Sequence, residues 1–89
     1  MSDRLERLLA VALAYDEGSR EAPRVTAKGQ GLLAEKIVAL AEENGITVEA
    51  NPILAEALAG VELDDTIPVE LFEATAEVIG FILRARQRL

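Results

Sequence analysis

The chain has 89 residues, of which 51% are hydrophobic, and its 16 acidic and 9 basic side chains give a net charge of −7 at pH 7. This length suits one small domain with a single core, and the acidic balance disfavours binding to nucleic acid or to anionic membrane surfaces. The sequence contains no Cys and no His, which removes disulfides, thiolate nucleophiles and the usual zinc sites and fits a reducing cytoplasm.

The N-terminal third predicts an arm followed by two strands. Residues 1–8 alternate charged residues with leucines, and we expect them to form an arm or a short helix ahead of a single domain, 9–89. Residues 9–15, LAVALAY, have apolar side chains on both faces of a strand; the alanines also permit a helix, but the turn residues that follow favour the strand. This run is too short to cross a bilayer, so we expect no direct membrane insertion. A second strand is predicted over 24–27.

The central stretch predicts a helix between two strands. Within residues 31–44, four apolar residues fall on one helical face: Leu33, Ile37, Leu40 and Ala41. Asn44 and Gly45 end this helix, because both tolerate the left-handed conformation of a helix C-cap. The β-rich run 46–50 then predicts a third strand, and a helix between two strands predicts a parallel βαβ unit. The expected fold is therefore α/β with a three-stranded sheet whose strand order stays open.

Two proline-started helices complete the predicted domain. Asn51 is the expected N-cap and Pro52 the first residue of a helix over 52–59, and Pro68 begins a last helix over 68–86. Six apolar side chains of the helices are expected to be buried: Leu33, Ile37, Leu40, Val78, Ile79 and Ile82. Phe81 falls on the polar side of the last helix, where it is either an anchor for a partner or covered by the N-terminal arm through Leu5 or Leu8.

Several short strings, in one order and spacing, resemble the C-terminal cytoplasmic domain of the FlhB/YscU family, the substrate-specificity switch components of flagellar and type III export. They are AVALAYD (10–16), APRVTAKG (22–29), NGI (44–46), NPxLA (51–55), IPxELFEA (67–74) and EVIGF (77–81). The resemblance implies a small sheet surrounded by helices. It also implies a cytoplasmic protein, peripheral to the membrane-embedded apparatus, with export-gate components or export substrates as partners.

The chain departs from the family at the self-cleavage motif. Family members carry Asn-Pro-Thr-His just before the first strand predicted here and cleave themselves between Asn and Pro, whereas the four matching positions, 5–8, read LERL. We therefore expect no self-cleavage, and a standalone protein that corresponds to the downstream part of the domain. The pair Asn51-Pro52 spells half of the motif, but its context indicates a helix start and not a second scissile bond.

Other candidate sites carry less weight. The run 28–31, KGQG, lies between a predicted strand and a helix, where backbone N–H groups can bind phosphate, but it lacks the Walker and GxGxxG spacings and favours a tight turn. The paired carboxylates at 42–43 and 64–65, and the acidic residues of the last helix, indicate a solvated surface. An enzymatic role and a weak surface cation site are both disfavoured. We expect no catalytic residue, metal or cofactor.

The predicted function is that of a non-enzymatic protein-interaction module of the export apparatus. Contacts are expected from Phe81 and Arg84 on the last helix and from pairing at the edge of the first strand, through Leu9, Val11 and Leu13. An alternative is a soluble regulator or decoy that uses the same fold outside the apparatus. A third hypothesis, an enzyme acting on small anionic metabolites at the Lys28 turn, is remote because His and Cys are absent.

Overall fold

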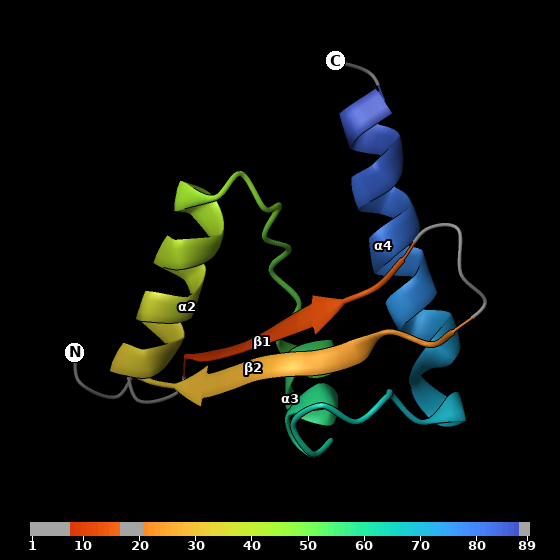
Figure 1. Cartoon of the computed structure of the whole chain (residues 1–89), viewed down its shortest axis with the longest axis horizontal. Helices are drawn as coiled ribbons and strands as arrows, with labels where there is room; N and C mark the ends of the chain where they lie inside the picture. The colour runs from red at the N-terminus through yellow and green to blue at the C-terminus, as the bar shows by residue number, and fades with distance from the viewer. Residues whose placement is uncertain (1–7, 17–20, 88–89) are drawn as a thin grey trace.

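The computed structural model describes residues 8–16 and 21–87, and these form an α/β domain, as predicted. The elements, in chain order, are β1 (Leu9–Ala14), β2 (Arg24–Gln30), α2 (Leu32–Glu43), α3 (Pro52–Ala59), the 3₁₀ helix η1 (Val69–Leu71) and α4 (Phe72–Gln87) (Figure 1). The predicted N-terminal arm lies, except for Leu8, outside the described residues.

The sheet of the described residues has two strands, β1 and β2, which pair antiparallel. The register runs from Leu9 opposite Gln30 to Ala14 opposite Arg24, with a bulge at Thr26 between the pairs formed by Ala12 and Leu13. The predicted third strand is wrong, and so is the parallel βαβ unit, because residues 46–50 form no strand. All five of these residues are exposed. A β-rich composition alone therefore produced no strand, because no strand of the described residues lies beside this segment to pair with it.

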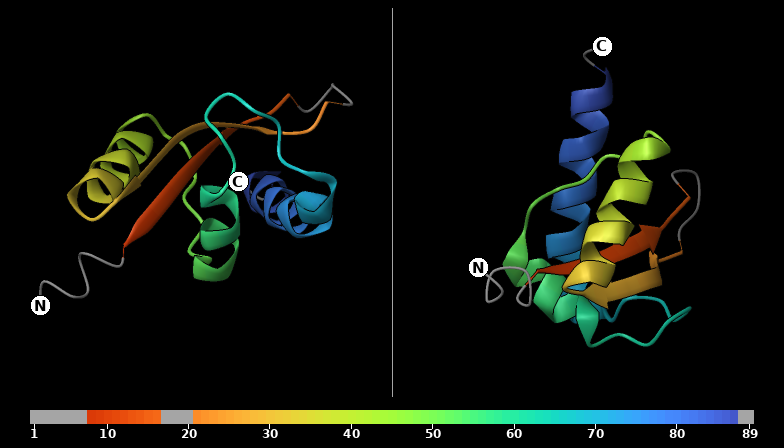
Figure 2. Two further views of the ribbon diagram at one scale, coloured as in Figure 1. Left: turned by 90° about the horizontal axis from the view of Figure 1, so that it is seen from below. Right: turned by 90° about the vertical axis from the view of Figure 1, so that its left-hand side faces the viewer.

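The two faces of the sheet carry different layers. Val25 of β2 forms the hydrophobic core with Leu54 and Leu58 of α3 and with Ile67. Val11 and Leu13 of β1 pack against this core from the same face of the sheet. Figure 2 shows α3 on one side of β1 and α2 on the other. The core therefore lies between the sheet and α3.

On the opposite face, small residues let α2 approach the sheet closely. Ala34 is fully buried, whereas Leu33 and Leu40 are 53% and 57% exposed, so the prediction that both leucines are buried is wrong. The contact of α2 with β2 is close: a Cβ atom on Gly29 would stand 2.5 Å from Leu33 Cγ. Leu33 and Ile37 therefore pack over this glycine, although more than half of the Leu33 side chain stays exposed.

The other helix residues that were predicted to be buried are only partly buried. Four of them are partly buried and none is fully buried: Ile37, Val78, Ile79 and Ile82. Val78 packs against the core, whereas the distal half of α4 extends away from the sheet (Figure 1). The prediction that these four side chains are buried is therefore met only in part, because a domain of this size covers its apolar helix faces incompletely.

The turn between β2 and α2 is shorter in the structure than the sequence predicted. β2 continues past 24–27 to Gln30, so that Gly31 alone makes the turn, with φ 64° and ψ −127°. This backbone conformation is essentially restricted to glycine. The Gly31 N–H donates to the Leu8 carbonyl oxygen at 2.8 Å and so extends the ladder by one pair.

After α3, the segment 61–67 returns along the free side of β2. The Val25 N–H donates to Asp65 O at 3.0 Å, and the Asp64 N–H donates back to Val25 O at 2.7 Å. Ile67 N–H donates to Pro23 O at 2.9 Å, and the chain then enters η1 through Pro68. The last helix was predicted to begin at Pro68, but a 3₁₀ turn precedes α4. The N-terminal half of β2 thus has backbone partners on both edges.

Candidate functional site

The free edge of β1 is the first candidate surface. Among the described residues β2 is the only strand that pairs with β1. The bond from Gly31 N to Leu8 O fixes the alternation of the ladder, so that Leu9 and Val11 direct their N–H and C=O groups toward the opposite edge. A row of this kind can accept an added strand from another protein.

Apolar side chains are exposed on the elements near that edge. α2, the segment after it and α4 all extend past β1 on this side of the sheet (Figure 1). α2 and the segment that follows it contribute four large apolar residues that are between 43% and 61% exposed: Leu33, Leu40, Ile46 and Val48. An added strand would therefore find both main-chain partners and apolar surface.

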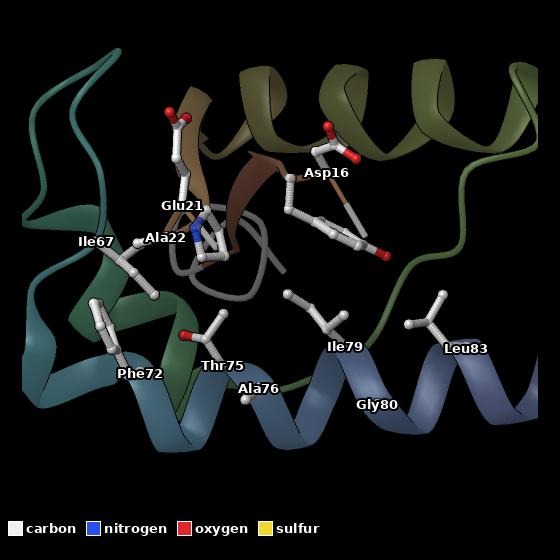
Figure 3. A pocket seen from close by; sticks show the side chains of 12 residues that line it. Asp16, Glu21, Ala22, Ile67, Phe72, Thr75, Ala76, Ile79, Gly80 and Leu83 are labelled. Carbon is white, nitrogen blue, oxygen red and sulfur yellow. The ribbon is translucent and has the colours of Figure 1, made fainter. Parts of the chain in front are cut away.

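A cavity between α4 and the ends of the two strands is the second candidate surface. Its volume is about 440 Å³. Thr75, Ile79 and Leu83 point into it from α4, and the opposite wall includes Ala22 and Asp16 (Figure 3). The remaining lining residues are Tyr15, Glu21, Pro23, Ile67, Phe72, Ala76 and Gly80. Most of this lining is apolar, which suits the side chain of a protein partner better than a charged metabolite.

Thr75 is the one buried polar residue of the described chain, with 1% of its surface exposed. Its hydroxyl oxygen has no hydrogen-bond partner among the described atoms, although it lies at the wall of the cavity. A buried hydroxyl without a partner costs stability. The Thr75 hydroxyl at the cavity wall is therefore expected to lower the stability of the fold.

The sequence analysis did not identify this cavity. A signal was present in α4, where Ala76 and Gly80 stand four residues apart on one side of the helix. Small residues at this spacing leave space beside a helix, but whether another element fills that space depends on tertiary packing. Here the described residues at the strand ends approach α4 without filling that space.

The predicted interaction residues occupy two separate places. Phe81 is 57% exposed and Arg84 is exposed, so the described residues do not cover Phe81; Leu5 lies outside them. On β1, Val11 and Leu13 turn their side chains toward the core. The edge therefore offers main-chain groups more than side chains, and the interaction role of these residues stays a prediction.

The remaining candidates have structural partners. Asn51 Oδ1 accepts a hydrogen bond from the Leu54 N–H at 3.1 Å, which confirms the predicted N-cap of α3. Lys28 Nζ donates to Ala59 O at 3.0 Å and to Val61 O at 2.8 Å. Lys28 is thus engaged with backbone carbonyls, and its strand does not form a phosphate-binding loop.

Residues 8–16 and 21–87 hold neither a candidate metal-binding cluster nor a helix that could span a membrane. These residues contain no group of three or more Asp and Glu side chains arranged to hold a metal ion. None of their helices combines the length and the apolar character needed to cross a membrane.

Comparison with known sequences identifies the chain's relatives. Residues 8–82 match the family model described as "FlhB HrpN YscU SpaS Family". The uncharacterized protein YlqH of Bacillus subtilis is 40% identical over 75 residues, which are 84% of this chain and 81% of YlqH. The flagellar biosynthetic protein FlhB of the same organism is 38% identical over 81 residues, which are 90% of this chain but only 22% of FlhB. The chain thus spans about a fifth of the FlhB proteins that it matches.

Solved structures show the same fold. The cytoplasmic domain of FlhB from Shewanella putrefaciens matches with a TM-score of 0.80 and 38% identity, over 86% of this chain and 65% of that one. The PscU C-terminal domain matches with a TM-score of 0.77 and 37% identity, over 83% of this chain and 95% of that one. The α/β arrangement described above is therefore that of these C-terminal domains.

Proposed function

The chain belongs to the FlhB HrpN YscU SpaS family, and from this premise we propose that it is a non-enzymatic protein-interaction module of the flagellar or type III export apparatus. It acts by binding, at the cytoplasmic side of the membrane, as the downstream part of the family's switch domain does. The absence of His and Cys from the sequence supports a binding role over a catalytic one.

The free edge of β1 is the observation that carries this proposal. Leu9 and Val11 present main-chain groups there, and exposed apolar residues lie on the neighbouring elements. This chain covers 65% of the solved FlhB cytoplasmic domain, and we propose that a segment of a family member outside the matched region pairs with the edge.

The proposed partner is the membrane half of a family member that lacks its own downstream fragment. A strand at the end of that membrane half would add to β1, and its apolar residues would cover Leu40 and Ile46. Phe81 and Arg84 on α4 would supply further contacts, because aromatic and arginine side chains carry much of the energy of protein interfaces. The cavity beside α4 is the second contact surface.

Co-purification and export assays test the proposal. Expressed in a strain whose switch component lacks its downstream fragment, the protein should co-purify with the membrane half and partly restore export. If export stays at background although the protein folds well, and no export component co-purifies, a regulator or decoy that uses this fold outside the apparatus becomes the better explanation.

A proline substitution separates strand addition from general destabilisation. Leu9→Pro removes an N–H that points away from β2, at the first residue of an edge strand, where proline is tolerated. We expect it to weaken binding at least tenfold, whereas Leu9→Ala, which keeps the N–H, should bind nearly as well as the unchanged protein. Equal binding by the two variants would contradict strand addition.

The cavity is tested by a matched pair on α4. Ala76 lines the cavity, whereas Ala74 lies on the same helix and does not. Ala76→Leu should reduce binding by occupying part of the space, and Ala74→Leu should leave it unchanged. Phe81→Ser adds a test of the exposed aromatic: lost binding at an unchanged melting temperature marks an interface residue, and a lowered melting temperature marks a packing role.

The proposal also includes the absence of self-cleavage. Asn51 is held as a helix N-cap by its bond from Leu54, and it shows neither a cis peptide bond nor a positive φ. Intact-mass analysis after several days at neutral pH should show one species. Two fragments that meet between Asn51 and Pro52 would disprove this part of the proposal.

A further inference from the structure

Lys28 makes the longest-range side-chain contact among the hydrogen bonds described above. It is partly buried on β2, and its ammonium group donates to the carbonyl oxygens of Ala59 and Val61, which lie 31 and 33 residues further along the chain. Ala59 is the last residue of α3, where carbonyl groups lack helical partners, and Val61 lies two residues beyond it. α3 has no basic residue in its own last turn, so the cation that favours a helix C-terminus comes from the sheet.

The second acceptor, Val61, is the first residue of the segment 61–67. Six residues after Val61, the buried Ile67 contributes to the core and lines the cavity. Between them the chain makes a tight turn through Asp64, whose φ of 70° is unfavourable for a residue other than glycine. A turn of this kind needs neighbouring contacts to hold it in place.

Strand β2 holds both ends of this segment. Lys28 holds Val61 at one end, and the backbone of Val25 holds Asp64 and Asp65 at the other. We infer that Lys28 is a positioning residue for the cavity, because it fixes the end of α3 and the start of the segment that supplies Ile67 to the cavity wall. The inference deepens the proposed function, since it concerns one of the two surfaces assigned there.

Amide hydrogen exchange tests the inference without any partner, so that its outcome is independent of the proposed function. Lys28→Met keeps the apolar stem and removes the donors, and charge-assisted bonds of this kind change local opening by about tenfold to a hundredfold. The amides of Asp64 and Ile67 should therefore exchange at least tenfold faster, while amides within α2 change little. Lys28→Arg, which can donate to both carbonyls, should restore slow exchange.

Lys36 provides the matched control, because it is exposed on α2. Lys36→Met should leave the exchange of Asp64 and Ile67 unchanged. The inference is overturned if Lys28→Met leaves these two amides unchanged, or if it accelerates the amides of α2 equally, since the effect would then be global. If Lys28→Met does not fold, Lys28→Gln replaces it, and the same two amides decide the outcome.

Discussion

The two faces of the sheet bury their apolar residues to very different degrees. On the α3 face, Val25, Leu54 and Leu58 are between 0% and 8% exposed. On the α2 face the buried residue is an alanine, and Leu33 and Leu40 remain more than half exposed. The α3 face therefore provides most of the hydrophobic stabilisation, whereas the α2 face keeps apolar surface that a partner can cover.

The largest loss of stability is expected from a substitution in the core between the sheet and α3. Leu58 is 4% exposed and belongs to the core cluster. Leu58→Ala should lower the free energy of unfolding by about 2–5 kcal/mol, a large share of the stability of a small domain. Denaturant melts measure the change. A loss below about 1 kcal/mol would mean that α3 is not the main packing partner of the sheet.

One added methyl group, in Gly29→Ala, should disturb the packing of α2 against the sheet. In Gly29→Ala the new Cβ would stand 2.5 Å from Leu33 Cγ and 3.0 Å from Ile37 Cδ1. We expect a loss of about 1–3 kcal/mol, because α2 must move away or adopt strained side-chain rotamers. Adding Leu33→Ala should recover part of this loss in a double-mutant cycle. Full additivity of the two changes would argue against the close packing described here.

Thr75 tests the effect of a buried polar side chain, because it lies at the wall of the cavity. Thr75→Val removes a hydroxyl that has no partner among the described atoms and keeps nearly the same shape. The expected result is a gain of about 1 kcal/mol in thermal or denaturant unfolding. A loss of stability would show that the hydroxyl is hydrogen-bonded in solution.

The smallest effect is expected on the flank of α2. Leu40 is 57% exposed, so Leu40→Ala should change the free energy of unfolding by less than about 0.5 kcal/mol. The same change should weaken partner binding more than it weakens folding. A stability loss above about 1 kcal/mol that grows with protein concentration would indicate that this flank is buried between copies of the chain.

Local signals predicted some elements well. The helix 52–59 was predicted with its observed bounds, because Asn51 and Pro52 specify a helix start through short-range bonding and a fixed φ. The first two strands were also predicted: residues 9–15 are apolar on both faces of a strand, and residues 24–27 form the first part of β2, which extends to Gln30. The family-level resemblance placed the whole chain in the fold that the solved relatives share.

Features that depend on distant neighbours were not predictable in the same way. The run 46–48 has strong β propensity, but no strand lies beside it to form a ladder. The close approach of α2 to the sheet depends on Gly29, a residue outside the helix, which the hydrophobic spacing of the helix does not report. The cavity and the contacts of Lys28 likewise join residues from separate elements, which no local pattern reports.

The return of segment 61–67 onto β2 has a consequence for how the chain folds. A two-stranded hairpin is marginally stable by itself in water, so β1 and β2 need the core residues Leu54, Leu58 and Ile67 before they persist. The bonds between Val25 and the Asp64–Asp65 pair close a loop of roughly forty residues. This closure costs chain entropy before burial of the core residues compensates for it. Hairpin, α3 and returning segment should therefore form in a single cooperative step, with loop closure setting the folding rate.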